Sequence, residues 1–186
     1  MADAIADTGP ILHLSEIDQL RALNIFARIT MPRLVLQELD KHNVTRGRFD
    51  NQMFELVIVD VPESKSQSLT EMVGQPVIHA ADAQVFVIAQ EPQFATPVLT
   101  DDLALRRRLE SAQATAVGTI GVLIRAYKQA FLTRQELDSS IAIPSPKSLF
   151  PARGGFVIRH FPSGLLGWSA SAIPREQKGN WRRYCQ

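Results

Sequence analysis

Residues 3–10 read DAIADTGP, a short apolar run that ends in an aspartate and is followed by a glycine and a proline. Short apolar runs bounded by turn residues are typical of strands in the core of a sheet, so residues 3–7 predict a buried strand that ends at Asp7. Gly9 and Pro10 interrupt this strand, and a helical spacing of apolar residues begins at Ile11. The start of the chain therefore predicts a strand, an acid at its carboxyl end, and then a helix.

The same alternation of strand and helix continues along the chain. Further strands are expected at residues 29–31, 54–60, 98–100 and 114–117, and a polar loop at residues 43–52. Helices are expected at residues 33–42, 64–73, 79–91, 103–111 and 119–131, around residues 20–25, and after Thr133, where Glu136 completes a capping box. Strands separated by helices predict an α/β fold with a mainly parallel central sheet that is covered on both faces.

The length and composition suit one domain of ordinary size. The chain has 186 residues, of which 45% are hydrophobic, so its core needs no disulfide or structural metal. The single cysteine, Cys185, excludes an intrachain disulfide and a CxxC zinc site. The N-terminus lacks the pattern of a signal peptide, and no apolar run approaches the roughly 18 residues of a membrane span. These features predict a cytoplasmic protein with no membrane partner.

Charge is distributed unevenly along the chain. Residues 1–143 carry 13 Lys or Arg against 18 Asp or Glu, whereas residues 144–186 carry 7 Lys or Arg against Glu176 alone. We expect a main domain over residues 1–143, a late strand at residues 156–161, and a basic, flexible tail over residues 168–186. Such a tail either attracts nucleic acid or an acidic partner, or is a solvated terminus.

Acidic residues follow two of the expected strands. Asp7 ends the first strand, and Asp101 and Asp102 come directly after the strand at residues 98–100. Ligands of open parallel sheets bind beyond the carboxyl ends of the strands, so these acids could meet at one rim. Each of them could instead serve only as a helix N-cap, a position that Asp favours.

Two more acids, Glu38 and Asp82, lie within apolar helical segments. A carboxylate in such surroundings is costly unless it is paired or bound to a metal. Crowded carboxylates raise one another's pKa, and a divalent cation that prefers oxygen ligands, Mg²⁺ or Mn²⁺, removes this repulsion. The alternative is pairing with a base, such as that of Glu38 with Lys41 or His42 at helical spacing.

Five segments occur in a distinctive order: IADTGPILHL, MPRLVLQELDK, HAADAQVFVIAQ, VLTDDLALRRRLE and VGTIGVLIRAYKQAFL. Over roughly residues 3–132 the chain resembles a PIN-domain protein, and it is most similar to the branch related to VapC-type toxins of prokaryotic toxin–antitoxin pairs. FVIRHFPSGLL at residues 156–166 is similar to the closing strand and short helix of that branch, which assigns residues 144–167 to the same domain. The resemblance implies a PIN-like α/β/α sandwich and a metal-dependent endoribonuclease.

The resemblance also implies roles for individual residues. The four family acids, which would be catalytic and bind metal, fall on Asp7, Glu38, Asp82 and Asp102. Asp101 would be a further or substitute metal ligand, while Thr8 and Thr100 would orient carboxylates or metal-bound water. The implied cofactor is Mg²⁺ or Mn²⁺, which can generate a hydroxide nucleophile and stabilise charge at phosphorus. The family often has Gly-Glu at its third position, where this chain has Ala81-Asp82, and the shorter Asp could shift the metal slightly.

The implied partners are an RNA substrate, a small antitoxin protein and a second copy of the chain. Arg106 and Arg107 follow the fourth acid and are expected to contact RNA phosphate, although a solvated helix face would have the same sequence. The stretch Gly118-Thr119-Ile120-Gly121 fits a GxxG loop only superficially, and it is interpreted as letting a helix start close to the sheet. His13 and His79 lie near the motifs, but a lone histidine is more often structural than catalytic.

Two other functions fit parts of the pattern. The same fold could serve as a non-catalytic RNA-binding or scaffolding module, which need not bind metal through these acids. Residues 7–9, Asp-Thr-Gly, also match the motif of an aspartic protease, but such enzymes need two carboxylates that share a proton in a β-rich fold. The helical content of the chain argues against that second alternative.

Overall fold

The computed structural model describes residues 2–65 and 79–142. The chain divides into two units, residues 1–143 and 144–186, and the fold described here belongs to the first. The expected segments 144–167 and 168–186, including the strand at residues 156–161, lie outside the described residues. So does most of the helix expected at residues 64–73.

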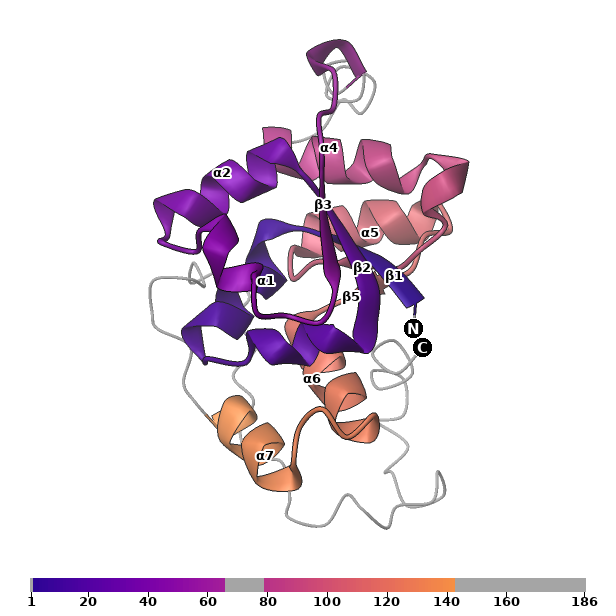
Figure 1. Ribbon diagram of the computed structural model, residues 1–186. Helices are drawn as coiled ribbons and strands as arrows, with labels where there is room; N and C mark the ends of the chain where they lie inside the picture. The colour runs from indigo at the N-terminus through magenta and orange to yellow at the C-terminus, as the bar shows by residue number, and fades with distance from the viewer. Residues whose placement is uncertain (1, 66–78, 143–186) are drawn as a thin grey trace, which may run out of the picture. The chain divides into compact units, whose positions relative to one another are not determined.

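The centre of the first unit is a five-stranded, wholly parallel sheet in the order β3-β2-β1-β4-β5 (Figure 1). Its strands are β1 (Ala2–Ala6), β2 (Phe26–Pro32), β3 (Glu55–Val59), β4 (Val98–Leu99) and β5 (Ala116–Val117). The middle strand pairs on both sides, since Ile5 lies opposite Thr30 of β2 and Val98 of β4. Ile5 is fully buried because both faces of the sheet are covered, which explains the uniformly apolar run that the sequence shows there.

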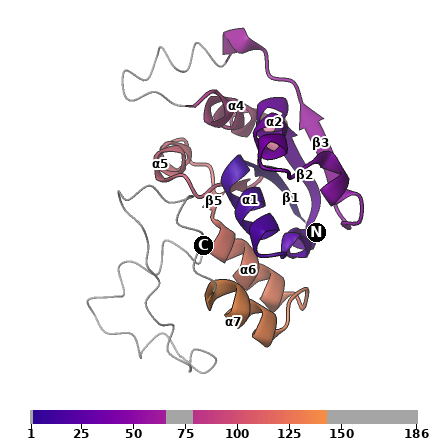
Figure 2. The same ribbon diagram turned by 90° about the vertical axis from the view of Figure 1, so that its left-hand side faces the viewer.

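Helices cover both faces of this sheet. They are α1 (Thr8–Glu16), α2 (Arg33–Lys41), α4 (Ala80–Ala89), α5 (Leu103–Ser111), α6 (Thr119–Lys128) and α7 (Arg134–Ala142), with short 3-10 segments η1 (Leu20–Ile25), η2 (Arg46–Phe49) and η3 (Pro92–Phe94). Viewed along the sheet from β3, α1 and α2 lie on one side and α4 and α5 on the other (Figure 1). Helix α6 packs against α1 and η1, and α7 packs against α6 (Figure 2). The expected α/β sandwich is therefore confirmed.

The order of the strands creates a switch point between β1 and β4. From β1 the chain steps outward to β2 and β3, and then returns to the opposite side of β1 to form β4 and β5. Because crossovers between parallel strands are right-handed, this reversal puts α1 and α2, which precede it, on one face of the sheet and α4 and α5 on the other. The helices that follow β1 and β4 thus diverge, and the carboxyl ends of these two strands are the place where open α/β sheets bind ligands.

The sequence placed most elements to within a few residues, and its errors have clear physical reasons. Gly9 and Pro10 were expected to precede the first helix, but they lie within the first turn of α1. Proline is tolerated there because its missing N–H would have had no intrahelical partner. The loop expected at residues 43–52 contains η2, and the stretch at residues 20–25 is a 3-10 helix.

The capping box at the start of α7 is confirmed. The Glu136 N–H donates to Thr133 Oγ1 at 3.3 Å, and the Thr133 N–H donates to Glu136 Oε2 at 2.8 Å.

The aspartic protease interpretation of residues 7–9 is wrong for the described part of the chain. Those residues join a strand to a helix in a parallel sheet covered by helices, not in a β-rich fold. No helix of the described ranges is long and apolar enough to span a membrane.

Truncation of a buried residue of α6 should destabilise this unit strongly. Leu123 is 2% exposed, whereas Ile120, on the same helix, is 39% exposed. We expect Leu123→Ala to lower the free energy of unfolding by about 2 to 5 kcal/mol, because it removes buried methyl groups and leaves a cavity. Ile120→Ala should cost less than about 1 kcal/mol. Urea denaturation of both variants measures the difference, and equal losses would contradict the described packing of α6.

Candidate metal centre

Four acidic side chains come from four different elements around the switch point. Asp7 directly follows β1, and Asp102 precedes α5 just beyond the end of β4. Glu38 lies on α2 and Asp82 lies in the first turn of α4. Their charges act on one another, because Asp102 and Glu38 raise the pKa of both Asp7 and Asp82, and Asp7 also raises that of Asp82. The fold thus brings together acids that are up to 95 positions apart in the sequence.

Asp7 is the most buried of the four, with 5% of its surface exposed. It is the N-cap of α1, where Oδ1 accepts from the Thr8 N–H at 2.7 Å, while Oδ2 accepts from Thr100 Oγ1 at 2.8 Å. Burial raises the pKa of Asp7 to about 6, although the hydrogen bonds from Thr100 and Thr8 act in the opposite direction and lower it. Capping and membership of the acidic cluster are therefore compatible roles.

Glu38 and Asp82 are each half-buried. Thr8 Oγ1 donates to Glu38 Oε2 at 2.7 Å, so the residue after Asp7 ties the start of α1 to α2. Burial is the main cause that raises the pKa of Asp82 to about 7, and the charges of Asp7 and Asp102 add to it. His79, the residue before α4, has the opposite effect on the pKa of Asp82.

The two consecutive aspartates after β4 have different surroundings. Asp102 is exposed and caps α5, because its Oδ1 accepts from the Leu105 N–H at 2.6 Å. Asp101 accepts from the Thr119 N–H at 2.9 Å, from the Thr119 hydroxyl, and from His13 Nδ1 at 2.8 Å. Burial would raise the pKa of Asp101, but these hydrogen bonds bring it below its ordinary value.

The hydroxyl of Thr100 and the small size of Gly118 help to position these acids. Thr100 is fully buried, and its Oγ1 accepts from the Asp102 N–H at 3.1 Å while donating to Asp7. A Cβ on Gly118 would lie 2.7 Å from Asp101 Oδ1, so only glycine leaves room for this carboxylate. The expectation that Gly118 lets a helix begin close to the sheet is confirmed, since it is the N-cap of α6.

The two arginines that were expected to contact RNA differ in their environment. Arg106 donates to the backbone carbonyls of Thr100 and Ala116, at 3.1 Å each, and so joins the ends of β4 and β5. Arg107, the next residue of α5, is exposed. This internal role of Arg106 could not be predicted from the run of three arginines, and RNA contact by either side chain stays a prediction.

The four acids fit a hard divalent cation by their chemistry. All offer carboxylate oxygens, the ligands that Mg²⁺ and Mn²⁺ prefer. Burial is the main cause that raises the pKa of Asp7 and Asp82, and the neighbouring acids add to it, so a bound cation would favour the charged form of both. Within residues 2–65 and 79–142, however, no three Asp, Glu, His or Cys side chains already form a group that could hold a metal ion.

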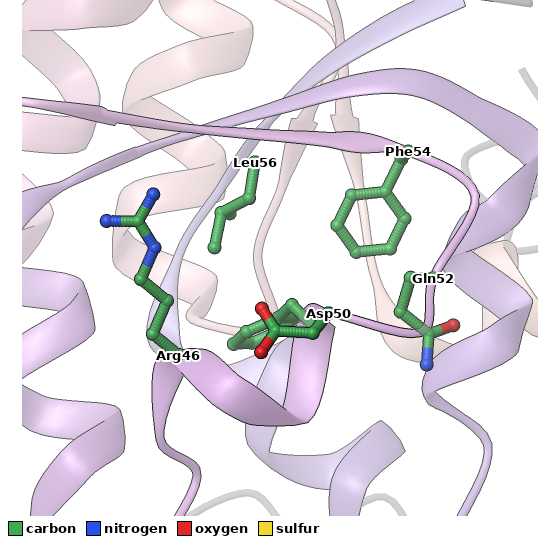
Figure 3. Close-up of a pocket in the computed structure, with 6 residues that line it drawn as sticks. Arg46, Asp50, Gln52, Phe54 and Leu56 are labelled. Carbon is green, nitrogen blue, oxygen red and sulfur yellow. The ribbon is translucent and has the colours of Figure 1, made fainter.

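A separate hollow lies beside the start of β3 (Figure 3). It is lined by Arg46, Phe49, Asp50, Gln52, Phe54 and Leu56. Arg46 and Gln52 flank it on opposite sides in Figure 3, and the rings of Phe49 and Phe54 pack edge to face with centroids 6.3 Å apart. None of the four acids lines this hollow, so it is distinct from the candidate metal centre.

The crowding of acids predicts how pH affects the stability of the metal-free protein. The folded chain binds a proton at Asp82 more tightly than the unfolded chain does, so ionisation of Asp82 lowers stability as the pH rises from about 4 to above 7. Asp82→Asn should therefore stabilise the protein at pH 8, by on the order of 1 kcal/mol, and have less effect at pH 4.5. Urea denaturation in EDTA at both pH values tests this, with the exposed Asp40→Asn as control. An Asp82→Asn variant that is less stable than the wild type at pH 8 would contradict it.

A family model for the PIN domain matches residues 3–142. No curated protein and no solved structure matches the chain. The family match covers the described sheet, its helices and all four acids. PIN domains are generally nucleases and typically use divalent metals. The five-stranded parallel sheet and its helices, with acids at the switch point, agree with this match, and the chain belongs to the PIN-domain family.

Proposed function

We propose that the protein is a metal-dependent ribonuclease that hydrolyses RNA phosphodiester bonds. Asp7, Glu38, Asp82 and Asp102 would hold Mg²⁺ or Mn²⁺ at the switch point. The observation that carries the proposal is the convergence of four acids from separate elements on the carboxyl ends of β1 and β4, where open parallel sheets bind ligands. Burial, together with the neighbouring acids, raises the pKa of Asp7 and Asp82, which also favours a functional site.

The surrounding side chains prepare the carboxylates for this task. Thr100 donates to one oxygen of Asp7, and the Thr8 N–H donates to the other. Thr8 also holds Glu38 through its hydroxyl. These bonds fix the orientation of two acids before any ligand arrives, as neighbouring hydrogen bonds commonly do around metal sites. A divalent ion bound there would supply Lewis acidity, lowering the pKa of water and offsetting charge on the phosphate.

RNA is the substrate that we propose from the resemblance to VapC-type toxins. In that case the physiological partners would be a small antitoxin protein and a second copy of the chain. Arg107 supports the choice of a nucleic acid, because it is exposed on α5, five residues after Asp102, and can attract phosphate. The basic residues 144–186 would add to this attraction.

A second candidate is a non-catalytic RNA-binding or scaffolding module of the same fold. The observation that favours it is that the described acids do not form a ready-made group for a metal ion. The two candidates differ in metal binding. A nuclease must draw its carboxylates around an ion, and the relief of repulsion between Asp7, Asp82 and Asp102 can offset the cost of doing so.

Replacement of Asp7 should abolish RNA cleavage without unfolding the protein. We expect Asp7→Asn to lower the rate of Mn²⁺-dependent cleavage by more than about 100-fold, because loss of a direct ligand should exceed the effect of losing an outer-shell partner. Asparagine is also a good N-cap, and its amide can donate to Thr100 Oγ1, so the fold should persist. The measurement is cleavage of a mixed-sequence RNA with Mn²⁺, Mg²⁺ or EDTA.

Asp40→Asn is the matched control for this experiment. Asp40 is exposed on α2, two residues from Glu38, and this change should leave cleavage unaffected. Cleavage that survives Asp7→Asn or EDTA would contradict the assignment of the site.

Metal binding by the wild type separates the two candidate functions. If the acids hold Mn²⁺, the ion should stabilise the folded protein by about 2.7 kcal/mol at a concentration 100 times its Kd. Urea denaturation with and without Mn²⁺ measures this stabilisation, and Asp7→Asn should remove most of it. RNA binding without any stabilisation by Mn²⁺ would favour the non-catalytic module.

A further inference from the structure

We infer that Asp101 is a positioning residue that clamps α1 and α6 to the end of β4, and that Asp102 is the one of these two aspartates that binds the metal. This inference rests on the proposed function, and it removes Asp101 as the further or substitute ligand that the resemblance implies. The clamp consists of Asp101, His13 on α1 and Thr119 at the start of α6.

Both carboxylate oxygens of Asp101 already accept hydrogen bonds. Oδ1 accepts from the Thr119 N–H at 2.9 Å, and Oδ2 accepts from His13 Nδ1 at 2.8 Å and from the Thr119 hydroxyl. A metal ion at Asp101 would have to displace these partly buried donors, each of which would then lack its partner. Asp102 is exposed, and its Oδ1 accepts from the Leu105 N–H in the cap of α5.

The charge of Asp101 is also balanced locally. Burial would lower the pKa of His13, but the hydrogen bond and the charge of Asp101 raise it above its ordinary value. His13 Nδ1 and Asp101 Oδ2 lie 2.8 Å apart, so the two side chains form an ion pair when His13 is protonated. Asp102, by contrast, acts on the other acids, because its charge raises the pKa of both Asp7 and Asp82.

The clamp can position the acidic cluster because α1 begins at Asp7 and Thr8, which belong to the cluster or bind it. Its first turn holds Thr8, which binds Glu38, and its N-cap is Asp7. His13 lies further along the same helix, so its bond to Asp101 fixes the helix relative to β4. Gly9 is also close to this point, since a Cβ there would lie 3.7 Å from Asp101 Cβ. A shift of α1 would therefore displace Asp7, Thr8 and Glu38 together.

On the other side, the clamp holds the start of α6. Thr119 is the first residue of this helix, and both its N–H and its hydroxyl bind Asp101. Gly118 makes the approach possible by lacking a Cβ. Figure 2 shows α1 and α6 side by side, as their packing contacts also require. Asp101 thus joins the end of β4 to α1 and to α6.

The first test compares Asp101→Asn with Asp102→Asn, two identical changes at adjacent positions. Titration of the metal-free full chain with Mn²⁺, followed by the electron paramagnetic resonance signal of the free ion, gives the affinity without relying on activity. We expect Asp102→Asn to weaken Mn²⁺ binding by more than about 100-fold and Asp101→Asn by only about 10-fold, the range for outer-shell partners. Thermal unfolding in EDTA should show the reverse order, with a lower midpoint for Asp101→Asn and little change for Asp102→Asn, because Asn still caps α5.

The second test uses His13 and does not touch either aspartate. His13→Leu removes the donor to Asp101, whereas His13→Asn keeps an N–H donor close to the position of Nδ1. We expect His13→Leu to weaken Mn²⁺ binding by about 10-fold, and His13→Asn to restore most of the affinity. A role in stability alone would lower the unfolding midpoint but leave the affinity of the folded protein unchanged.

The outcomes separate this inference from the proposed function. Equal, complete loss of Mn²⁺ binding in Asp101→Asn and Asp102→Asn would show that Asp101 is a ligand and overturn the inference alone. So would an unchanged affinity in His13→Leu, a result that remains decisive if Asp101→Asn does not fold. A wild-type protein that binds no Mn²⁺ would overturn the proposed function, and the inference with it.

Discussion

Burial of neighbouring carboxylates at the carboxyl ends of β1 and β4 is the constraint around which this part of the molecule is arranged. The burial of Asp7 and the partial burial of Asp82 put negative charge where water cannot screen it, and the pKa of each rises accordingly. Hydrogen bonds from Thr8 and Thr100 offset part of this cost. The remainder is a local destabilisation that a bound cation would relieve, so the site and the stability of the fold are linked.

Much of the fold could be predicted from the sequence because its signals are local. The apolar run ending at Asp7, the helical spacing of residues 103–111 and the Thr133–Glu136 capping box each depend on neighbours within a turn or two. The resemblance also indicated which acids to examine, and the structure places Asp7, Glu38, Asp82 and Asp102 within mutual electrostatic influence. That they bind metal stays a prediction.

What the sequence could not reveal depends on contacts between distant residues. His13 and Asp101 are 88 positions apart, and a single histidine at helical spacing carries no sign of its partner. Arg106 belongs to a run of three arginines that resembles a solvated face, yet it binds the carbonyls of Thr100 and Ala116. Such roles arise only once the order of the strands brings β4 between β1 and β5.

The consecutive aspartates show how the backbone can give adjacent, chemically identical residues different tasks. Asp102 has an extended backbone, with φ −72° and ψ 121°, as the N-cap of α5. The carboxylate of Asp101 bonds to His13 on α1 and to Thr119 on α6, whereas that of Asp102 caps α5 and acts on the remaining acids. An acid that is paired in this way can bring the elements of the site together without adding to the repulsion between the four acids. The same geometry explains why the capping and metal-binding interpretations of Asp102 need not compete, since a carboxylate can cap a helix with one oxygen and offer the other to a cation.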